Sequence, residues 1–294
     1  MKFTTEVKSF LGSHGSDKIY ATTLGDMTWD MYWYSNKYDL PYYVTDVSAG
    51  LGSLTMFHTI GNHDHDMKTS VNGTSAGWDA VDWDTATAFR NNLGPNYYSF
   101  NIGKVHYVVV DNIYNKNTTG GQSDDRHYEE AVSRDNLAWL KEDLKFVDKS
   151  TPIIVAMHSP LYNQNGSYAL TNTSELISCF SGFSSVRFVT GHSHKIWNVN
   201  AGAISENNSG SICGAWWWSG YYCPTLHVAQ DGSPSGYRVM NINGKEYTSY
   251  FKAIGRADDY QFRSYDRNSI KFDTNIKYGA EFKADLASHG GYDV

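Results

Sequence analysis

The chain has 294 residues, of which 19% are charged and 15% aromatic, and its formal net charge is −7. This length suits one large domain or one domain with an extension. The acidic balance argues against nucleic acid as a bulk partner, because proteins that bind it normally present a basic field. No apolar run approaches the ~18 residues of a membrane helix, and the first residues do not have the pattern of a signal peptide.

The first part of the chain alternates between short helices and short apolar strands. The spacing of apolar residues predicts a helix over residues 3–11, and an aromatic-rich segment over residues 29–38 predicts another, which ends before Pro41. Two apolar runs are typical of strands that are buried on both faces. These runs are residues 19–24, which end in Gly25-Asp26, and residues 54–60, which end in Gly61-Asn62-His63-Asp64.

The middle of the chain continues this alternation. A helix is expected to end at Asn92, and residues 97–102 and 105–110 form a predicted hairpin around Gly103-Lys104. Ser133 then caps a helix with one apolar face. Two further apolar strands, separated by a short helix near residues 174–180, are residues 152–157 before His158 and residues 186–190 before Gly191-His192-Ser193-His194. The pattern predicts an α/β (α+β) fold in which helices pack on a sheet core.

After His194 the sequence becomes rich in β-like runs. They are residues 196–200, 213–218, 237–242 and 247–253. Asn243-Gly244 is the best two-residue hairpin signal in the chain. We expect these runs to complete a second sheet. From about residue 256 the sequence is polar and loosely patterned, which suggests the start of a further module.

Some chemically interesting residues have simple structural explanations. The spacing of Asp79, Asp82 and Asp84 does not fit a calcium loop, and we interpret them as carboxylates at the start of a helix. His106 lies inside a predicted strand, where a hydrogen-bonded structural histidine is the simpler interpretation. Cys213 and Cys223 could close a disulfide in an oxidising compartment, whereas unpaired thiols are the plainer alternative.

Polar residues follow four of the predicted apolar strands, at the point where each strand ends. Because ligands gather at the carboxyl ends of parallel strands, we expect these side chains to meet at one edge of the sheet. Oxygen and imidazole donors together suit Zn, Fe or Mn better than Ca or Mg. The converging set is Asp26, Asn62, His63, His158, His192 and His194.

A site with two metal ions would give a role to most of these six residues. Two dications ~3.5–4 Å apart need a bridging anion, and together they can activate water and polarise a phosphoryl oxygen. Asp26 is the candidate bridge, and His194 could reach the second metal. The ligands that could complete the first metal are Asn62, His158 and His192.

The remaining pair has a proton-transfer role. His63 directly follows a candidate ligand, so it is held beside the site without having to bind metal. It could donate a proton to the leaving oxygen. Asp64 could hold and charge that imidazole, as a carboxylate behind a histidine does.

These motifs carry a resemblance to a known family. The order of Gly25-Asp26-Met27-Thr28-Trp29-Asp30, Gly61-Asn62-His63-Asp64, His158 and Gly191-His192-Ser193-His194 resembles the signature of calcineurin-like metallophosphoesterases over residues 20–195. Residues 94–100 and 231–237 resemble the bacterial branch with an extra C-terminal β domain, whose members are usually exported.

The resemblance implies a two-sheet αββα sandwich and a two-metal phosphoesterase site with the roles given above. It implies a phosphoesterase domain over residues 1–255 and the start of a C-terminal extension over residues 256–294. It also implies an exported or periplasmic protein whose leader lies outside this chain. Without that leader, a cytoplasmic location is expected.

The chain departs from the family in one place. The family's first motif, Asp-x-His or Asp-x-Gln at the end of a strand, is not found before Gly25, where His14 and Asp17 lie in a glycine-rich turn. We therefore expect one metal to have its full ligand set while the other keeps Asp26 and His194. We also expect a missing core strand, truncation at both ends, a weak second metal and poor activity.

The sequence also bears on two alternative functions. A catalytically weakened binding protein for a sugar- or nucleotide-like ligand could use the aromatic residues Trp216, Trp217, Trp218, Tyr221 and Tyr222 as a platform, although tryptophans that pack into a sheet are the simpler explanation. A serine hydrolase is disfavoured because Lys195 replaces the last glycine of G-x-S-x-G. The sequence therefore predicts metal-dependent hydrolysis of a phosphate mono- or diester, carried by a small molecule or phospho-sugar, with one or two Mn, Fe or Zn ions.

Overall fold

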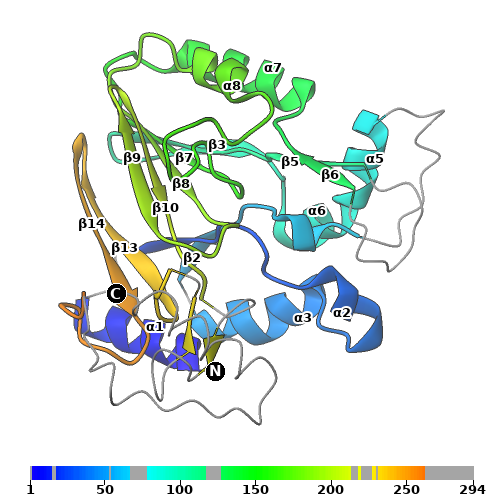
Figure 1. The fold of residues 1–294 in the computed structure, drawn as a ribbon, viewed down its shortest axis with the longest axis vertical. Coiled ribbons are helices and arrows are strands. Elements are labelled where there is room, and N and C mark those ends of the chain that lie inside the picture. The colour runs from blue at the N-terminus through cyan, green and yellow to red at the C-terminus, as the bar shows by residue number, and fades with distance from the viewer. Residues whose placement is uncertain are drawn as a thin grey trace, which may run out of the picture.

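The computed structural model describes residues 2–14, 18–52, 54–66, 78–116, 127–212, 218–219, 227–229 and 231–261 (Figure 1). Several predictions of the sequence lie outside these residues. They are the disulfide between Cys213 and Cys223, most of the aromatic platform at Trp216, Trp217, Tyr221 and Tyr222, the candidate Asp17, and nearly all of the extension over residues 256–294.

A mixed six-stranded sheet forms the centre of the described part of the chain. Its order is β3 (Tyr98–Ile102), β4 (Val105–Val109), β7 (Ile153–Ala156), β8 (Val186–Thr190), β10 (Ile204–Asn208) and β9 (Trp197–Ala201). Strands β4, β7, β8 and β10 run parallel, while β3 and β9 pair antiparallel at the two edges. Two of the apolar runs predicted as buried strands, β7 and β8, therefore end at the same edge of this sheet, as parallel pairing requires.

Two helices cover one face of this sheet, as Figure 1 shows at the top of the view. Helix α7 (Arg134–Asp143) begins at Ser133, whose hydroxyl oxygen accepts the N–H of Asn136 at 3.3 Å, and it continues into the 3-10 turn η4 (Leu144–Phe146). Helix α8 (Thr173–Cys179) lies beside it. Their apolar faces meet the strands in the largest core, around Leu140, Leu176 and Phe188.

A second layer lies against the opposite face. It contains the parallel pair β1 (Tyr20–Thr22) and β2 (Thr55–Phe57) and the hairpin β13 (Gly236–Asn243) and β14 (Glu246–Ala253). Buried Val105, Ile154 and Val189 of the central sheet pack with Leu24 and Met240 of this layer. The predicted α/β class, with helices on a mixed sheet and further strands beneath it, is confirmed.

Helix α1 (Lys2–His14) packs against the hairpin at the other end of the sequence. Phe3 and Phe10 meet the ring of Tyr237 edge-on, with centroids 6.0 and 6.3 Å away. The buried ammonium of Lys252 donates to Glu6 Oε1 at 2.6 Å and to the carbonyl of Arg256 at 2.5 Å. The ion pair is stable here because further acceptors surround the buried charge.

The remaining elements connect the layers. They are α2 (Asp30–Ser35), α3 (Leu40–Tyr42), the π-helical turn η1 (Tyr43–Ser48), η2 (Ala49–Leu51), η3 (Asn62–Asp64), α5 (Trp78–Thr85), α6 (Thr87–Leu93), and the pairs β5 (Ile113–Asn115) with β6 (Tyr128–Glu130) and β11 (Trp218–Ser219) with β12 (His227–Val228). The helix predicted over residues 29–38 is shorter, because Asn36 adopts a non-helical conformation. Where one helix was predicted to end at Asn92, the structure has two, α5 and α6. The predicted strand over residues 54–60 ends at Phe57.

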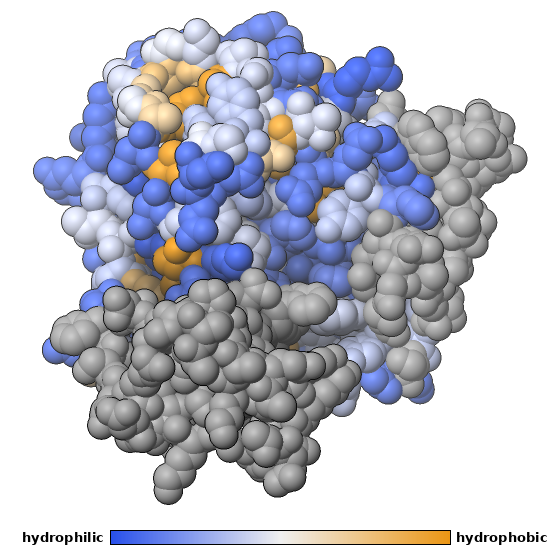
Figure 2. Space-filling model, viewed as in Figure 1, coloured by the Kyte–Doolittle hydropathy of each residue, from blue (hydrophilic) through white to orange (hydrophobic). Residues whose placement is uncertain are grey.

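The surface visible in Figure 2 is largely hydrophilic, with small, separated hydrophobic areas. No helix among the described residues is long and apolar enough to cross a membrane.

Candidate metal centre

The turns after four strands bring polar side chains to one place. Asp26 follows β1, Asn62 lies in the 3-10 turn after β2, His158 follows β7, and His192 follows β8. One ligand atom from each of Asp26, His158 and His192 lies within 4.8 Å of the others. The structure thus gathers residues that are far apart in the sequence, at the sheet edge where parallel strands end.

His158 is fixed in the tautomer that suits a metal ligand. Its Nδ1 lies 2.6 Å from the carbonyl oxygen of Leu24, which can only accept, so Nδ1 carries the hydrogen. Burial lowers the pKa of His158 to about 4, so the imidazole is neutral near pH 7. The other nitrogen, Nε2, then presents a bare lone pair.

This lone pair faces other acceptors. The Nε2 of His158 lies 2.9 Å from Asn62 Oδ1, 3.4 Å from Asp26 Oδ1 and 2.9 Å from His192 Nδ1. The Nε2 of His192 lies 3.2 Å from a carboxylate oxygen of Glu130, which accepts its hydrogen and leaves Nδ1 as a second lone pair. A cation placed between these four atoms would be bound by their lone pairs. One carboxylate oxygen, one amide oxygen and two imidazole nitrogens fit Zn, Fe or Mn.

The charges of the site depend on one another. Burial alone would raise the pKa of Asp26, but the nearby imidazoles of His158, His63 and His192 and the backbone N–H of His63 outweigh it and lower that pKa. Burial would likewise lower the pKa of His192, but the hydrogen bond and charge of Glu130 prevail and raise it. The centre therefore holds a carboxylate in its charged form among imidazoles, which is the state that a metal requires.

The backbone of these turns is strained. Asp26, His192 and His194 have φ of 55°, 63° and 57°, in the left-handed region that side chains with a Cβ rarely occupy. The preceding glycines allow the close approach: a Cβ on Gly25 would lie 2.3 Å from His158 Nδ1, and a Cβ on Gly61 would lie 2.3 Å from Asp26 Oδ1. Strain of this kind persists where surrounding contacts fix it, and it is concentrated at functional sites.

Asp64 has a different task from the one predicted for it. Its carboxylate accepts the backbone N–H groups of Asp26 at 2.7 Å, Gly61 at 2.9 Å and Thr28 at 3.2 Å, and the hydroxyl of Thr28 at 3.2 Å. As the third residue of its 3-10 turn, it accepts the backbone N–H of Gly61 at the start of that turn. Burial, followed by the charge of Asp26, raises the pKa of Asp64 well above its usual value, against the effect of these hydrogen bonds.

The carboxylate beside His63 belongs to Asp30. Its Oδ1 lies 2.9 Å from His63 Nδ1, and the side chain of Asp30 is buried. The ring of Trp29 stacks on the same imidazole, with centroids 4.7 Å apart and an interplanar angle of 28°. The predicted pairing of His63 with Asp64 is thus corrected: the motif that carries Asp26 also supplies the partner of the histidine.

Other predicted residues are placed as follows. His194 lines the same cavity as Asp26 and His63, but its ring is not part of the group of atoms that meet around His158. His106 lies between Asn101 and Asp143, at 3.0 and 2.9 Å, which confirms that it is a hydrogen-bonded structural histidine. Asp82 lies in the second turn of α5, where its Oδ1 accepts the N–H of Asn115 at 2.7 Å, so the interpretation as a helix-start carboxylate is wrong for that residue.

Sequence reasoning missed Glu130 and Asn112. The amide oxygen of Asn112 accepts the N–H groups of His158 and Ser159 at 3.1 Å each, and its amide nitrogen donates to the carbonyl of Ser159 at 2.8 Å. Asn112 follows an apolar strand just as the candidate ligands do, so the same rule could have found it. Glu130 lies in a short irregular strand and gives no comparable signal.

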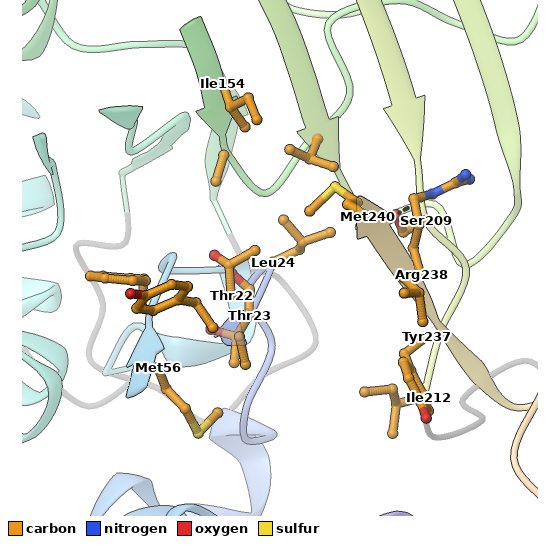
Figure 3. A pocket seen from close by; sticks show the side chains of 18 of the residues that line it. Thr22, Thr23, Leu24, Met56, Ile154, Ser209, Ile212, Tyr237, Arg238 and Met240 are labelled. Carbon is orange, nitrogen blue, oxygen red and sulfur yellow. Dashed lines mark hydrogen bonds between the residues drawn. The ribbon is translucent and has the colours of Figure 1, made fainter. Parts of the chain in front are cut away.

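The centre opens onto a cavity of about 2150 Å³ between the two layers. Figure 3 shows Thr22, Thr23 and Leu24 on one side of it and Arg238 and Met240 of β13 on the other, with Ile154 of the central sheet above. Many of the lining residues are apolar, and Asp26, His63 and His192 are among the polar ones.

Two family models match long segments of the chain. Residues 6–196 match the family model of calcineurin-like phosphoesterases, and residues 206–282 match that of the C terminal of calcineurin-like phosphoesterase. Purple acid phosphatase 23 of Arabidopsis thaliana is 42% identical over 74 residues, which are 24% of this chain and 13% of that protein.

A solved structure shares the fold. GAP50, the anchor in the inner membrane complex of Plasmodium, superposes with a TM-score of 0.50 and 13% identity over 100% of this chain and 92% of that chain. A 5'-nucleotidase from Candida albicans gives a TM-score of 0.44 and 14% identity, with 98% of this chain and 51% of that chain covered.

Proposed function

Because the chain belongs to the calcineurin-like phosphoesterase family, we propose that it hydrolyses a phosphate mono- or diester at the centre formed by Asp26, Asn62, His158 and His192. We propose a small-molecule ester or a phospho-sugar as substrate and one or two Mn, Fe or Zn ions as cofactor. The observation that carries the proposal is the bare Nε2 of His158, which faces two oxygen acceptors and a second imidazole within 3.4 Å.

The residues divide into those that would hold metal and those that would act on the substrate. Asp26, Asn62, His158 and His192 supply the donor atoms. A bound divalent cation would withdraw charge from the phosphoryl oxygens and make water a better nucleophile. His194, which lines the cavity beside them, is proposed as a ligand of a second ion or as a group that faces the substrate.

His63 is proposed as the proton donor. Asp30 accepts the hydrogen on Nδ1 and Trp29 stacks on the ring, so the imidazole is held with Nε2 free to act. As water adds to phosphorus and the bond to the leaving oxygen breaks, the doubly protonated ring of His63 would give its Nε2 proton to that oxygen and would keep the Nδ1 hydrogen on Asp30. Asp64 would contribute indirectly, because it fixes the backbone of Asp26 and Gly61 that places these groups.

The test combines metal analysis with turnover. Purified chain is loaded with Mn²⁺, Zn²⁺ or Fe²⁺, its metal content is measured, and hydrolysis of p-nitrophenyl phosphate and bis-p-nitrophenyl phosphate is followed. We expect His158→Ala to lose both metal and turnover, and His63→Ala to lose turnover while it keeps the metal. His106→Ala is the matched control, because it removes a buried histidine that is also paired with a carboxylate, Asp143 at 2.9 Å.

The outcomes separate the alternatives. Turnover that depends on His63 but not on His106 supports the phosphoesterase. Full metal occupancy without turnover of either ester would favour a binding protein over an enzyme. A wild-type chain that is folded and takes up none of the three metals would refute the proposed centre.

A further inference from the structure

Strand β10 carries polar residues in the interior of the molecule. Glu206, Asn207, Asn208 and Ser209 are exposed by 0%, 6%, 0% and 8%, although the strand lies inside the sheet between β8 and β9. Buried polar side chains are costly unless they are hydrogen-bonded. The hydrogen-bond partners of these residues therefore indicate what their side chains do in the interior.

Asn208 holds the turn that carries His192. Its amide nitrogen donates to the carbonyl of Gly191 at 2.8 Å and to the hydroxyl of Thr190 at 3.0 Å. Its amide oxygen accepts the hydroxyl of Ser193 at 2.7 Å. Residues directly before and after His192 are thus fixed to one buried side chain.

Glu206 holds the segment that follows His158. Its two carboxylate oxygens accept the N–H groups of Leu161 and Tyr162, each at 2.8 Å. The same carboxylate accepts the hydroxyl of Thr190 at 2.6 Å. Because residues two apart point to the same face of a strand, Glu206 and Asn208 both reach Thr190, and its hydroxyl joins them.

We propose that Glu206 and Asn208 form a clamp on β10 that positions His158 and His192 as metal ligands. The inference rests on the proposed function and adds two positioning residues to it. His192 and His194 lie in the left-handed region on either side of Ser193, and a strained turn keeps its shape only where surrounding contacts determine it. The clamp supplies those contacts from a strand that carries none of the proposed ligands.

The chemical identity of each member follows from its bonds. Asn208 must donate and accept at once, so aspartate cannot replace it, because an ionised carboxylate has no hydrogen to give to Gly191. Glu206 receives three donors, so glutamine cannot replace it, because its amide nitrogen would face a donor. Thr190 both donates and accepts through one hydroxyl, which valine of the same shape lacks.

The first experiment measures metal affinity. Asn208→Ala, Glu206→Gln and Thr190→Val are titrated with Mn²⁺ or Zn²⁺ by calorimetry and compared with wild type. We expect each to bind about 10–100-fold more weakly, the loss that follows when groups that orient metal ligands are removed. Asn207→Ala is the matched control: Asn207 is the neighbouring buried asparagine, but it contacts Asn198, Arg187 and Tyr247 instead of the ligand turns.

The second experiment needs no metal. Ring signals of ¹⁵N-labelled histidines are recorded in metal-free protein. We expect those of His192 and His158 to shift or multiply in Asn208→Ala and Glu206→Gln, while those of His58 and His106 stay in place. A merely structural loss would disturb all four histidines alike, or would appear equally in Asn207→Ala.

The results decide the inference in either direction. Affinity and ring signals that match wild type in Asn208→Ala and Glu206→Gln would overturn it, and so would an equal loss in Asn207→Ala. A wild-type chain that binds no metal would remove the proposed function, and the ring spectra would then support or overturn the clamp by themselves.

Discussion

The sharpest prediction concerns Asp64, whose carboxylate accepts three backbone N–H groups and one hydroxyl. Replacing it with asparagine keeps the shape but leaves one oxygen acceptor. That oxygen can retain the bonds from Asp26 and Gly61, and at a pH above the raised pKa of Asp64 each weakens by about 1 kcal/mol because the acceptor loses its charge. The amide nitrogen then faces the N–H of Thr28, and a buried donor without a partner costs about 1–3 kcal/mol. We therefore expect Asp64→Asn to unfold about 3–5 kcal/mol more easily than wild type.

Urea unfolding in the presence of a chelator, followed by tryptophan fluorescence, measures this difference without a contribution from bound metal. Asp39→Asn is the control, because Asp39 caps α3 by accepting the N–H of Tyr42 at 3.0 Å, and asparagine caps a helix as well as aspartate does. That variant should stay within about 0.5 kcal/mol of wild type. An equally small change in Asp64→Asn would show that the carboxylate does not organise the two turns.

Three further predictions concern the titrating and proton-carrying groups. Asp30→Asn should lower kcat about 10²-fold while bound metal is unchanged, because His63 loses its charged partner; an unchanged kcat in the ester assay would contradict this. Glu130 raises the pKa of His192, so this ring takes up a proton more readily than a free imidazole as the pH falls, and that proton competes with metal for Nδ1. Affinity should then fall as the pH drops below neutral, which calorimetry in two buffers of different ionisation enthalpy detects as proton release. Burial lowers the pKa of His58 to about 4 from 6.5, because the folded protein disfavours the charged ring. The folded state therefore keeps its full stability above pH 6.5 and loses stability as the pH falls from 6.5 to 4. The loss should be about 3 kcal/mol of unfolding free energy. If the unfolding free energy of His58→Gln falls with pH between 6.5 and 4 as steeply as that of wild type, His58 is not the group responsible.

Part of the site could be predicted from the sequence because neighbouring parallel strands end at the same edge of a sheet. Parallel pairing forces the ends of β7 and β8 to be neighbours, so His158 and His192 could be placed together from their positions after apolar runs. The partners of those residues could not. Asp30 reaches His63 through the local path of the chain after Asp26, and Glu130 reaches His192 from a three-residue strand that has no periodic pattern.

The same limit applies to the fold. Strand β10 was not expected, because Glu206-Asn207-Asn208 has the composition of a loop, and its place inside the sheet depends on hydrogen bonds to distant turns. Where strands could be identified by apolar runs alone, as in β7 and β8, the predicted ranges agree with the structure to within a residue or two. Runs of apolar residues in a sequence indicate which strands are buried. The hydrogen bonds that allow polar residues to be buried cannot be predicted until their partners are known.

The contact between α1 and the hairpin has a consequence for folding. Lys252 and Glu6 are separated by 246 positions, so during synthesis α1 leaves the ribosome long before its partner strand β14. At about 5–20 residues per second that delay is on the order of tens of seconds. During that time the apolar side of α1, with Phe3 and Phe10, stays without its final partner. Nascent chains of this protein should therefore depend on chaperone binding at α1 until β14 has emerged.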